Sequence, residues 1–238
     1  MSNRRVFDVY MSQPYPCSYL PNRMATTVFV APFVSKTSLL YNKLSQHGFR
    51  RSGNDIYSPH CEHCQACLAV RLPVKHFTPR RSQRRVWRKN QDLKVSAVAP
   101  TFEPEHFNLY YRYLADRHKD GGMTNPTREE YIGFLTSTWS KTVFYEFRLE
   151  KQLVAIAVVD SVENGISAVY TFFDPNYSER SLGVYAILWE IEEAKRLNLE
   201  WLYLGYWVEE CQKMSYKIEY QPLQYFSQGR WWPFDLKN

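Results

Sequence analysis

The chain has 238 residues, of which 45% are hydrophobic and 23% are charged. This balance is typical of a globular protein and excludes wholesale disorder, while the modest Gly and Pro content excludes a collagen-like or low-complexity chain. The apolar runs fall far short of the roughly 18 residues that indicate a membrane span. The N-terminus lacks the apolar core of a secretory signal, so we expect a cytoplasmic protein with no membrane partner.

Positive charge is concentrated in one segment of the chain. The formal net charge is +6, but residues 71–94 hold nine basic residues and one acidic residue, which is a local charge of +8. The rest of the chain therefore carries a net charge of −2. A polyanion, above all a nucleic acid, fits such a segment. The alternative is that these charges form an ordinary solvated helix face.

In the first hundred residues the pattern predicts few regular elements. Helical spacing over Leu39–His47, with Gly48 at the place of a C-cap, predicts a helix. Short strands are expected at Ile56–Tyr57 and at Leu68–Leu72, and a basic helix at Arg80–Asn90. The remainder of this part is expected to be irregular.

The second part of the chain is more regular, and we place a boundary between a domain at residues 1–98 and one at residues 99–238. Two helices, three antiparallel strands, a helix and a final strand follow in order: Pro104–Lys119, Asn125–Ser137, Thr142–Leu149, Leu153–Val162, Ile166–Phe173, Leu182–Leu197 and Trp201–Val208. This order is typical of the GNAT-like acyltransferase fold of acetyl-CoA-dependent N-acetyltransferases. We therefore predict an α+β protein: a mainly antiparallel mixed sheet with flanking helices, plus a smaller N-terminal domain that holds the cysteines.

Four of the five cysteines could form a metal site. Three of them follow a C-x-x-C-x-x-C pattern, which suits thiolates that meet one ion across a tight turn. A tetrahedral site then lacks one ligand, and Cys17 is the candidate for it, so the predicted ligands are Cys17, Cys61, Cys64 and Cys67. Zinc or an iron–sulfur cluster would fit; the alternative is a set of reduced or redox-sensing thiols. Cys211 lies far along the chain and is not expected to take part.

Several separate motifs resemble the arginyltransferase family, whose members transfer an amino acid from aminoacyl-tRNA to a protein N-terminus. The motifs are GFRRSG at residues 48–53, the three-cysteine run, RSQRR at 81–85, YTFFDP at 170–175 and LGYWVEECQKMSYK at 204–217. The short length and the cysteine run are similar to the bacterial branch. That resemblance implies transfer of leucine from leucyl-tRNA to proteins with N-terminal Asp or Glu, which marks them for degradation. It also implies a cytoplasmic enzyme. Family members have been linked to both zinc and iron–sulfur clusters.

The implied reaction is the aminolysis of an ester that is already activated, so it requires no cofactor, no ATP and no enzyme nucleophile. Three alternatives remain open on the sequence. The donor could be arginyl-tRNA, the protein could be an ordinary acetyl-CoA N-acetyltransferase, or it could be a metal-bound nucleic-acid module without enzymatic activity.

Candidate catalytic residues lie on the strands and loop where acyl donors sit in this fold. They are Asp174, Tyr170 and Tyr206, for which a turn Asp and two core tyrosines are the alternatives. Glu190 and Glu193 are interpreted as solvated helix charges. The carboxylate of an acidic acceptor needs a cation, and the candidates for acceptor binding are Lys213, Lys217, Tyr216, Arg50, Arg51 and Arg71. Lys213 and Lys217 are four residues apart, which predicts one helical face.

Candidate donor-binding residues come from two places. Arg180 and Gly183 form an R-x-x-G sequence ahead of the long helix, whose N-terminus could bind an anion. Within the basic segment, the candidates for tRNA phosphate contacts are Arg84, Arg85, Arg88 and Lys89.

Overall fold

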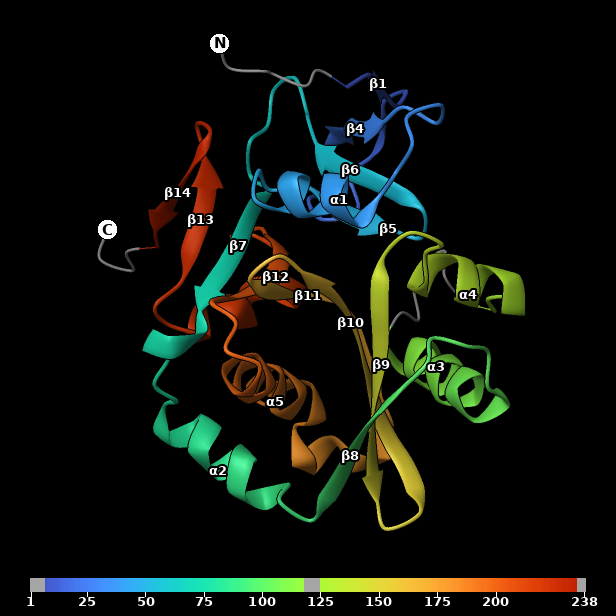
Figure 1. The fold of residues 1–238 in the computed structure, drawn as a ribbon, viewed down its shortest axis with the longest axis vertical. Helices are drawn as coiled ribbons and strands as arrows, with labels where there is room; N and C mark the ends of the chain where they lie inside the picture. The colour runs from blue at the N-terminus through green and yellow to red at the C-terminus, as the bar shows by residue number, and fades with distance from the viewer. Residues whose placement is uncertain (1–6, 118–124, 235–238) are drawn as a thin grey trace.

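The computed structural model describes residues 7–117 and 125–234, and its centre is an eight-stranded sheet (Figure 1). The strand order is β14-β13-β7-β12-β11-β10-β9-β8, and every neighbouring pair is antiparallel except β11 and β12. The strands are β7 Leu68–Pro73, β8 Leu93–Val98, β9 Lys141–Leu149, β10 Gln152–Val162, β11 Gly165–Phe173, β12 Trp201–Trp207, β13 Gln224–Ser227 and β14 Arg230–Pro233.

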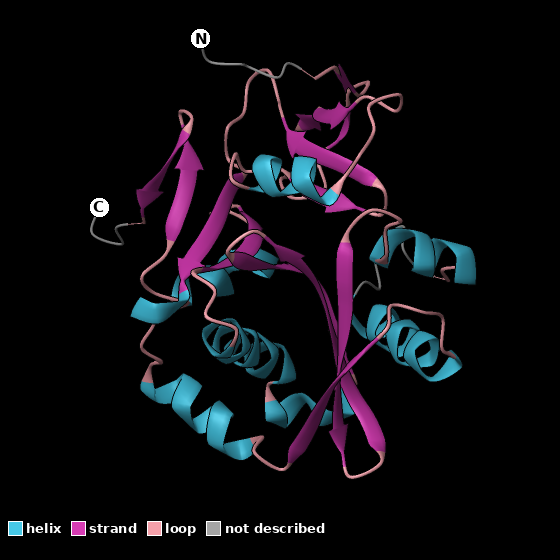
Figure 2. Ribbon diagram, in the orientation of Figure 1, coloured by secondary structure: helices cyan, strands magenta, loops and turns pink. Residues whose placement is uncertain are grey.

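Helices cover both faces of this sheet (Figure 2). On one face lies α5 (Leu182–Arg196), with α2 (Arg81–Lys89) packed beside it; on the other lie α3 (Pro104–Arg117) and α4 (Arg128–Leu135). The side chains of β10 alternate between the cores of the two faces, and all its residues from 153 to 160 are buried. Burial on both faces explains why this strand is an uninterrupted apolar run. Among the described helices, none has both the length and the apolar character needed to cross a bilayer.

A smaller unit from the N-terminal part sits at one end of the large sheet. Its four-stranded sheet has the order β1-β4-β6-β5, with β1 Val9–Met11, β4 Thr27–Val30, β6 Asp55–Pro59 and β5 Arg50–Ser52. A two-stranded pair, β2 (Tyr15–Pro16) with β3 (Met24–Ala25), and the helix α1 (Ser38–Ser45) complete it. Tyr41 and Ile56 pack with Val162 and Tyr203 of the large sheet in one core cluster, so α1 and β6 of the smaller unit pack against β10 and β12.

The α+β class and the main elements of the second part are confirmed by the structure. Helix α1 also lies where expected, and Gly48 after it has a φ of +82°. The expectation that the first hundred residues are mostly irregular is wrong, because β1 to β5 and β8 lie there. The expected boundary at residue 98 also divides one sheet, since β7 and β8 precede it and pair with β12 and β9. The final residues of the expected helix 104–119 lie outside the described part of the chain.

Candidate active site

The large sheet opens between its two parallel strands. β11 and β12 pair only where Gly165–Ser167 faces Trp201–Tyr203. Beyond that point β11 stays with β10, and β12 stays with β7. Both strands carry a register irregularity near the opening, after Ala168 in β11 and after Tyr203 in β12, where Gly205 has a φ of +80°. Bulges of this kind turn a strand away from its neighbour, and backbone carbonyls at the opening then need other partners.

Two buried cations from distant parts of the chain supply those partners. Arg50, on β5, donates from Nη2 to the carbonyl oxygen of Ala168. Lys217, on the 3₁₀ helix η3 (Gln212–Glu219), donates from Nζ to the carbonyl oxygen of Tyr206. Only 7% of each residue is exposed. Two like charges are therefore held together in the sheet opening, away from water.

Burial and the positive charge of Arg50 lower the pKa of Lys217 from 10.5 to about 7, an effect that Cys211 partly offsets. Desolvation disfavours the charged form of a lysine, and a neighbouring cation acts in the same direction. Near neutral pH the Lys217 amine is thus divided between its charged and neutral forms. A carboxylate placed beside it would restore the charged form.

Glu190 lies on the buried side of α5 with only 1% of its surface exposed. Neither of its carboxylate oxygens has a hydrogen-bond partner among the described residues. Burial raises the pKa of this carboxyl from 4.5 to about 8, against the opposing effect of Arg50. The interpretation of Glu190 as a solvated charge is wrong. A sequence signal existed, because Glu190 lies one helical turn from both Ala186 and Ala194, which are fully buried.

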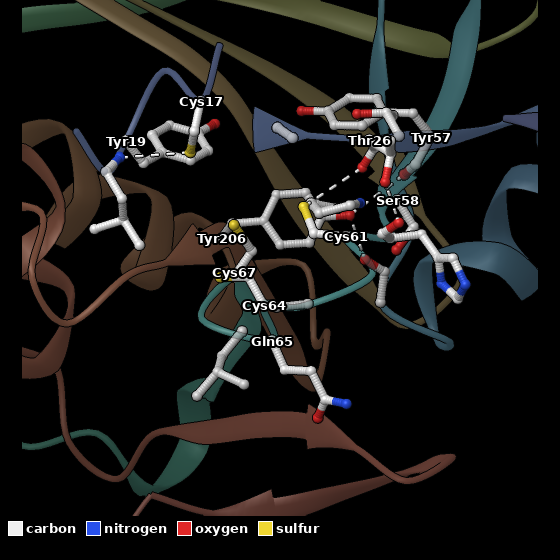
Figure 3. Close-up of a pocket in the computed structure, with 18 of the residues that line it drawn as sticks. Cys17, Tyr19, Thr26, Tyr57, Ser58, Cys61, Cys64, Gln65, Cys67 and Tyr206 are labelled. Carbon is white, nitrogen blue, oxygen red and sulfur yellow. Dashed lines mark hydrogen bonds between the residues drawn. The ribbon is translucent and has the colours of Figure 1, made fainter. Parts of the chain in front are cut away.

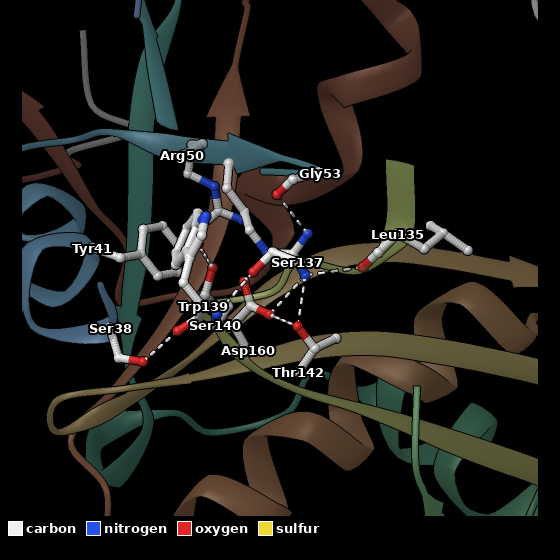
Figure 4. A network of polar contacts seen from close by, with 12 residues as sticks. Ser38, Tyr41, Arg50, Gly53, Leu135, Ser137, Trp139, Ser140, Thr142 and Asp160 are labelled. Atoms are coloured by element: carbon white, nitrogen blue, oxygen red, sulfur yellow. Dashed lines mark hydrogen bonds and ion pairs between the residues drawn. The ribbon is translucent and has the colours of Figure 1, made fainter. Parts of the chain in front are cut away.

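Arg51 does not face this opening, although it neighbours Arg50 in sequence. Its Nε and Nη2 atoms donate to the two carboxylate oxygens of Asp160 at 2.5 and 2.7 Å, and both side chains have no exposed surface. Figure 4 shows Asp160 with Thr142 and the Leu135 carbonyl, which complete the network. Arg51 is fully used in this structural network, so its assignment to acceptor binding is corrected.

Two other expected acceptor-binding cations also lie apart from the opening. The Arg71 guanidinium stands between the rings of Trp201 and Trp231, 3.5 and 4.3 Å from their centres, and its Nε donates to Gln224 at 2.9 Å. Lys213 is exposed, whereas Lys217 is buried. The expectation of one shared face assumed an α-helix, but the segment is a 3₁₀ helix with three residues per turn.

Tyr216 borders the opening on its solvent side. It is 41% exposed, and Lys217 Nζ lies 5.9 Å from the centre of its ring. Desolvation and the charge of Glu190 raise the pKa of Tyr216 to about 12. The Tyr216 hydroxyl is thus neutral at physiological pH.

The three residues expected to be catalytic have structural contacts. Asp174 accepts a hydrogen bond from the Asn176 backbone N–H at 3.0 Å and pairs with Arg112 at 2.9 Å, so both of its oxygens are engaged. The Tyr206 hydroxyl donates to the Gly48 carbonyl oxygen at 2.9 Å. Tyr170 packs in an aromatic cluster on the α3 side of the sheet. Each of the three side chains is thus hydrogen-bonded or packed within the fold.

Comparison with known proteins places the whole chain in one family. Family models described as the N terminus and the C terminus of arginine-tRNA-protein transferase match residues 15–85 and 105–227. The chain belongs to the arginine-tRNA-protein transferase family. The aspartate/glutamate leucyltransferase of Hahella chejuensis is 51% identical over 97% of this chain and 99% of that protein. The one from Saccharophagus degradans is 50% identical over 98% and 100%.

Likeness to solved structures is weaker. The L-PGS structure from Bacillus licheniformis covers 61% of this chain and 48% of its own, with 13% identity and a TM-score of 0.48. A score this low carries no argument about the fold, and the transferase family rests on the sequence matches.

The basic segment of this transferase presents a charged helix face to solvent. In α2, all four expected phosphate contacts are exposed: Arg84, Arg85, Arg88 and Lys89. Gln83 is buried on the opposite side, where its side chain donates to the Glu219 carbonyl oxygen at 3.2 Å. Lys89 also donates to the Glu179 carbonyl oxygen at 2.6 Å. The helix is therefore docked by one side, and its other sides keep their cations in water.

The R-x-x-G sequence has a packing role in the structure. Arg180 makes two bonds of 2.9 Å to the carboxylate of Asp92. A Cβ at Gly183 would lie 3.0 Å from the ring of Phe173, so glycine allows α5 to approach the end of β11 closely. Anion binding by Arg180 would first have to break its bidentate ion pair.

The four expected metal-ligating cysteines line one pocket, which has a volume of about 360 Å³ (Figure 3). All five cysteines are free thiols. Within residues 7–117 and 125–234, however, no three His, Cys, Asp or Glu side chains converge closely enough to hold a metal ion. As placed, the thiols therefore do not form a preformed zinc or iron–sulfur site.

Proposed function

We infer that this chain transfers leucine from leucyl-tRNA to the α-amine of proteins that begin with Asp or Glu. The observation that carries this inference is the pair Arg50 and Lys217, two buried cations at the sheet opening. An acidic side chain between them would neutralise a charge that is costly to bury alone. The names of relatives at about 50% identity over nearly the whole chain support the same acceptor and the same donor.

The reaction requires little covalent chemistry from the protein. The amine of the acceptor attacks the ester carbonyl of leucyl-tRNA, the C–O bond to the ribose breaks, and an amide forms. Holding amine and ester together in the reactive geometry can lower the barrier by about 7–11 kcal/mol. Arg50 and Lys217 contribute to this by fixing the acidic side chain, and hence the amine next to it.

The tRNA is held by the exposed cations of α2. Phosphate contacts require cations that solvent can reach, which Arg85 and Arg88 provide. The acyl chain then enters an acyltransferase-like fold between β11 and β12. The order of elements supports that assignment. It consists of two helices, three antiparallel strands, a helix and a parallel strand, with an opening between the last two strands. Charged tRNA and nascent substrates are cytoplasmic, so the enzyme is expected to act there.

A direct assay separates this function from its alternatives. The purified protein is incubated with tRNA charged with radiolabelled leucine or arginine, or with labelled acetyl-CoA, and with a peptide that begins with Asp. We expect label in the peptide from leucyl-tRNA alone. Transfer from arginyl-tRNA at the same rate would contradict the leucyl donor, and transfer from acetyl-CoA alone would contradict the reaction class.

A further inference from the structure

Two buried ionisable groups near the sheet opening, Glu190 and Arg50, have polar atoms without hydrogen-bond partners among the described residues. Both oxygens of Glu190 and the Nη1 atom of Arg50 have no hydrogen-bond partner within the part of the chain that the structure describes. A buried ionisable group without a partner costs free energy, so each such group in a native fold requires a specific explanation. The field of Arg50 acts on Glu190, so the two groups are electrostatic neighbours.

The proposed acceptor carries charged groups that could pair with both Glu190 and Arg50. An N-terminal Asp or Glu carries an α-ammonium and a side-chain carboxylate only a few bonds apart. Two cations lie at the opening, Arg50 on β5 and Lys217 on η3, and the buried carboxyl of Glu190 on α5 lies within the electrostatic field of Arg50. The two cations can bind the carboxylate, which leaves Glu190 to bind the ammonium.

We propose that Glu190 is a catalytic residue that binds the α-ammonium of the acceptor and takes a proton from it. This proposal rests on the proposed function and adds to it the group that activates the nucleophile. The two oxygens of Glu190, which have no partner among the described residues, serve as the proton acceptor that the reaction requires.

The proton balance of the step is complete. A proton moves from the α-ammonium to the carboxylate of Glu190, which gives a neutral amine and a carboxylic acid. The amine forms a C–N bond to the ester carbon, and the tetrahedral adduct then loses the C–O bond to the ribose. A second proton passes from the nitrogen to the departing ribose oxygen, which leaves as a hydroxyl. Glu190 finally releases its proton to solvent.

The surroundings of Glu190 suit this role. Besides Arg50, the groups that feel its charge are the phenols of Tyr145, Tyr216 and Tyr220, whose own pKa values are raised mainly by burial. These phenols are neutral at pH 7 and leave the carboxyl's charge uncompensated; the Tyr220 hydroxyl is itself a buried atom without a partner. Burial raises the pKa of Glu190 from its ordinary value toward that of a free α-ammonium, about 7.7–8.0, which favours proton transfer between the two groups.

The test compares Glu190→Gln with the parent in single-turnover leucine transfer to an Asp peptide. General-base catalysis is worth about 10²–10⁴-fold, so we expect a loss of at least about 10²-fold. Leucyl-tRNA binding should not change. The matched control is Glu193→Gln on the same helix, since Glu193 is 8% exposed but paired with Arg196 at 2.6 Å. That variant should transfer leucine nearly as the parent does.

A second acceptor separates proton abstraction from a merely structural role. In an otherwise identical peptide the α-amine is replaced by an aminooxy group, whose nitrogen is already neutral at pH 7. The loss caused by Glu190→Gln should shrink to less than about tenfold with this acceptor. An equal loss with both acceptors, or parental activity with the Asp peptide, would overturn the proposal.

If Glu190→Gln fails to fold, Glu190→Asp takes its place. It keeps a carboxylate at a changed position and, relative to the parent, should lose more transfer to the Asp peptide than to the aminooxy peptide. The reverse ranking would overturn the proposal. A parent protein that transfers no leucine to either peptide would instead contradict the proposed function, so the two failures are distinguishable.

Discussion

Arg50 and Lys217 point at the same face of Gly205. The Nε and Nη2 atoms of Arg50 and the Nζ atom of Lys217 each lie 3.7 Å from the position that a Cβ on Gly205 would occupy. One cation comes from the N-terminal unit and the other from the last third of the chain, so the site exists only when both parts are docked. A Cβ at residue 205 would meet both cations at ordinary contact distance, so the φ of +80° rather than a lack of space favours glycine there.

Lys217 should make stability depend on pH between neutral and alkaline conditions. Its pKa is about 7 in the folded protein and 10.5 in a free lysine. Between these values the unfolded chain binds more protons, so the contribution of Lys217 to the free energy of unfolding rises with pH. In urea titrations, the parent minus Lys217→Met difference should rise from pH 7 to pH 10. The exposed Lys213→Met is the control and should give a flat difference; a flat curve for Lys217→Met would contradict the account.

The Arg51–Asp160 pair should be a major contributor to stability. Both side chains are fully buried, and removing one partner of such a pair costs about 3–5 kcal/mol because it leaves an uncompensated charge. Asp160→Asn should lower the free energy of unfolding by that amount. Asp55→Asn breaks a pair with Lys36 in which Asp55 is 54% exposed, and it should cost less than about 1 kcal/mol. Similar losses in both variants would show that burial does not govern the difference.

The exposed cations of α2 should set the salt dependence of tRNA binding. Each phosphate contact contributes about 0.7–0.9 to the slope of log K against log salt. Replacing Arg85 and Arg88 with Ala should therefore weaken binding and flatten the slope by up to about twice that value. The control is the double variant Lys36→Ala and Lys43→Ala, which removes the same charge at and near α1. An unchanged slope for the α2 variant places the tRNA elsewhere.

The cysteine pocket gives a fourth prediction. Protein isolated without oxygen should contain zinc or iron held by Cys17, Cys61, Cys64 and Cys67, after their thiols turn toward a common point. Metal analysis and absorption spectra test this. Cys211, distant in sequence, packs in one cluster with Cys17, Cys64 and Cys67, so its replacement does not serve as a control. Four free thiols and no bound metal in the anaerobic protein would contradict the predicted metal site.

Local sequence patterns predict much of the fold. Strand-length apolar segments and the turn residues between them predicted β9, β10 and β11, and helical spacing predicted α3 and α5. A strand pattern was also present in β8, where Leu93, Val95 and Ala97 alternate with Lys94 and Ser96, but the segment was interpreted as a boundary. Strands β13 and β14 were not predicted, and they are short edge strands.

The site was only partly predictable. Arg50 and Lys217 were among the candidates, but so were Arg51 and Arg71, and nothing local distinguishes them. Arg51 is hydrogen-bonded to Asp160, 109 residues further along the chain, and the Arg71 guanidinium contacts two tryptophan rings. Partners this distant are set by tertiary packing, so sequence spacing cannot tell which arginine remains free for a ligand.

The most direct test of the account is acceptor discrimination. The ratio of kcat/KM for leucine transfer to peptides that begin with Asp and with Asn is measured for the parent and for Lys217→Met. The two peptides are nearly isosteric, and the uncharged one leaves the buried cations without a counter-charge, so the parent ratio should be about 10² or more. It should fall at least tenfold in Lys217→Met. Equal use of both peptides by the parent would contradict the claim that buried cations at the sheet opening read the acidic residue.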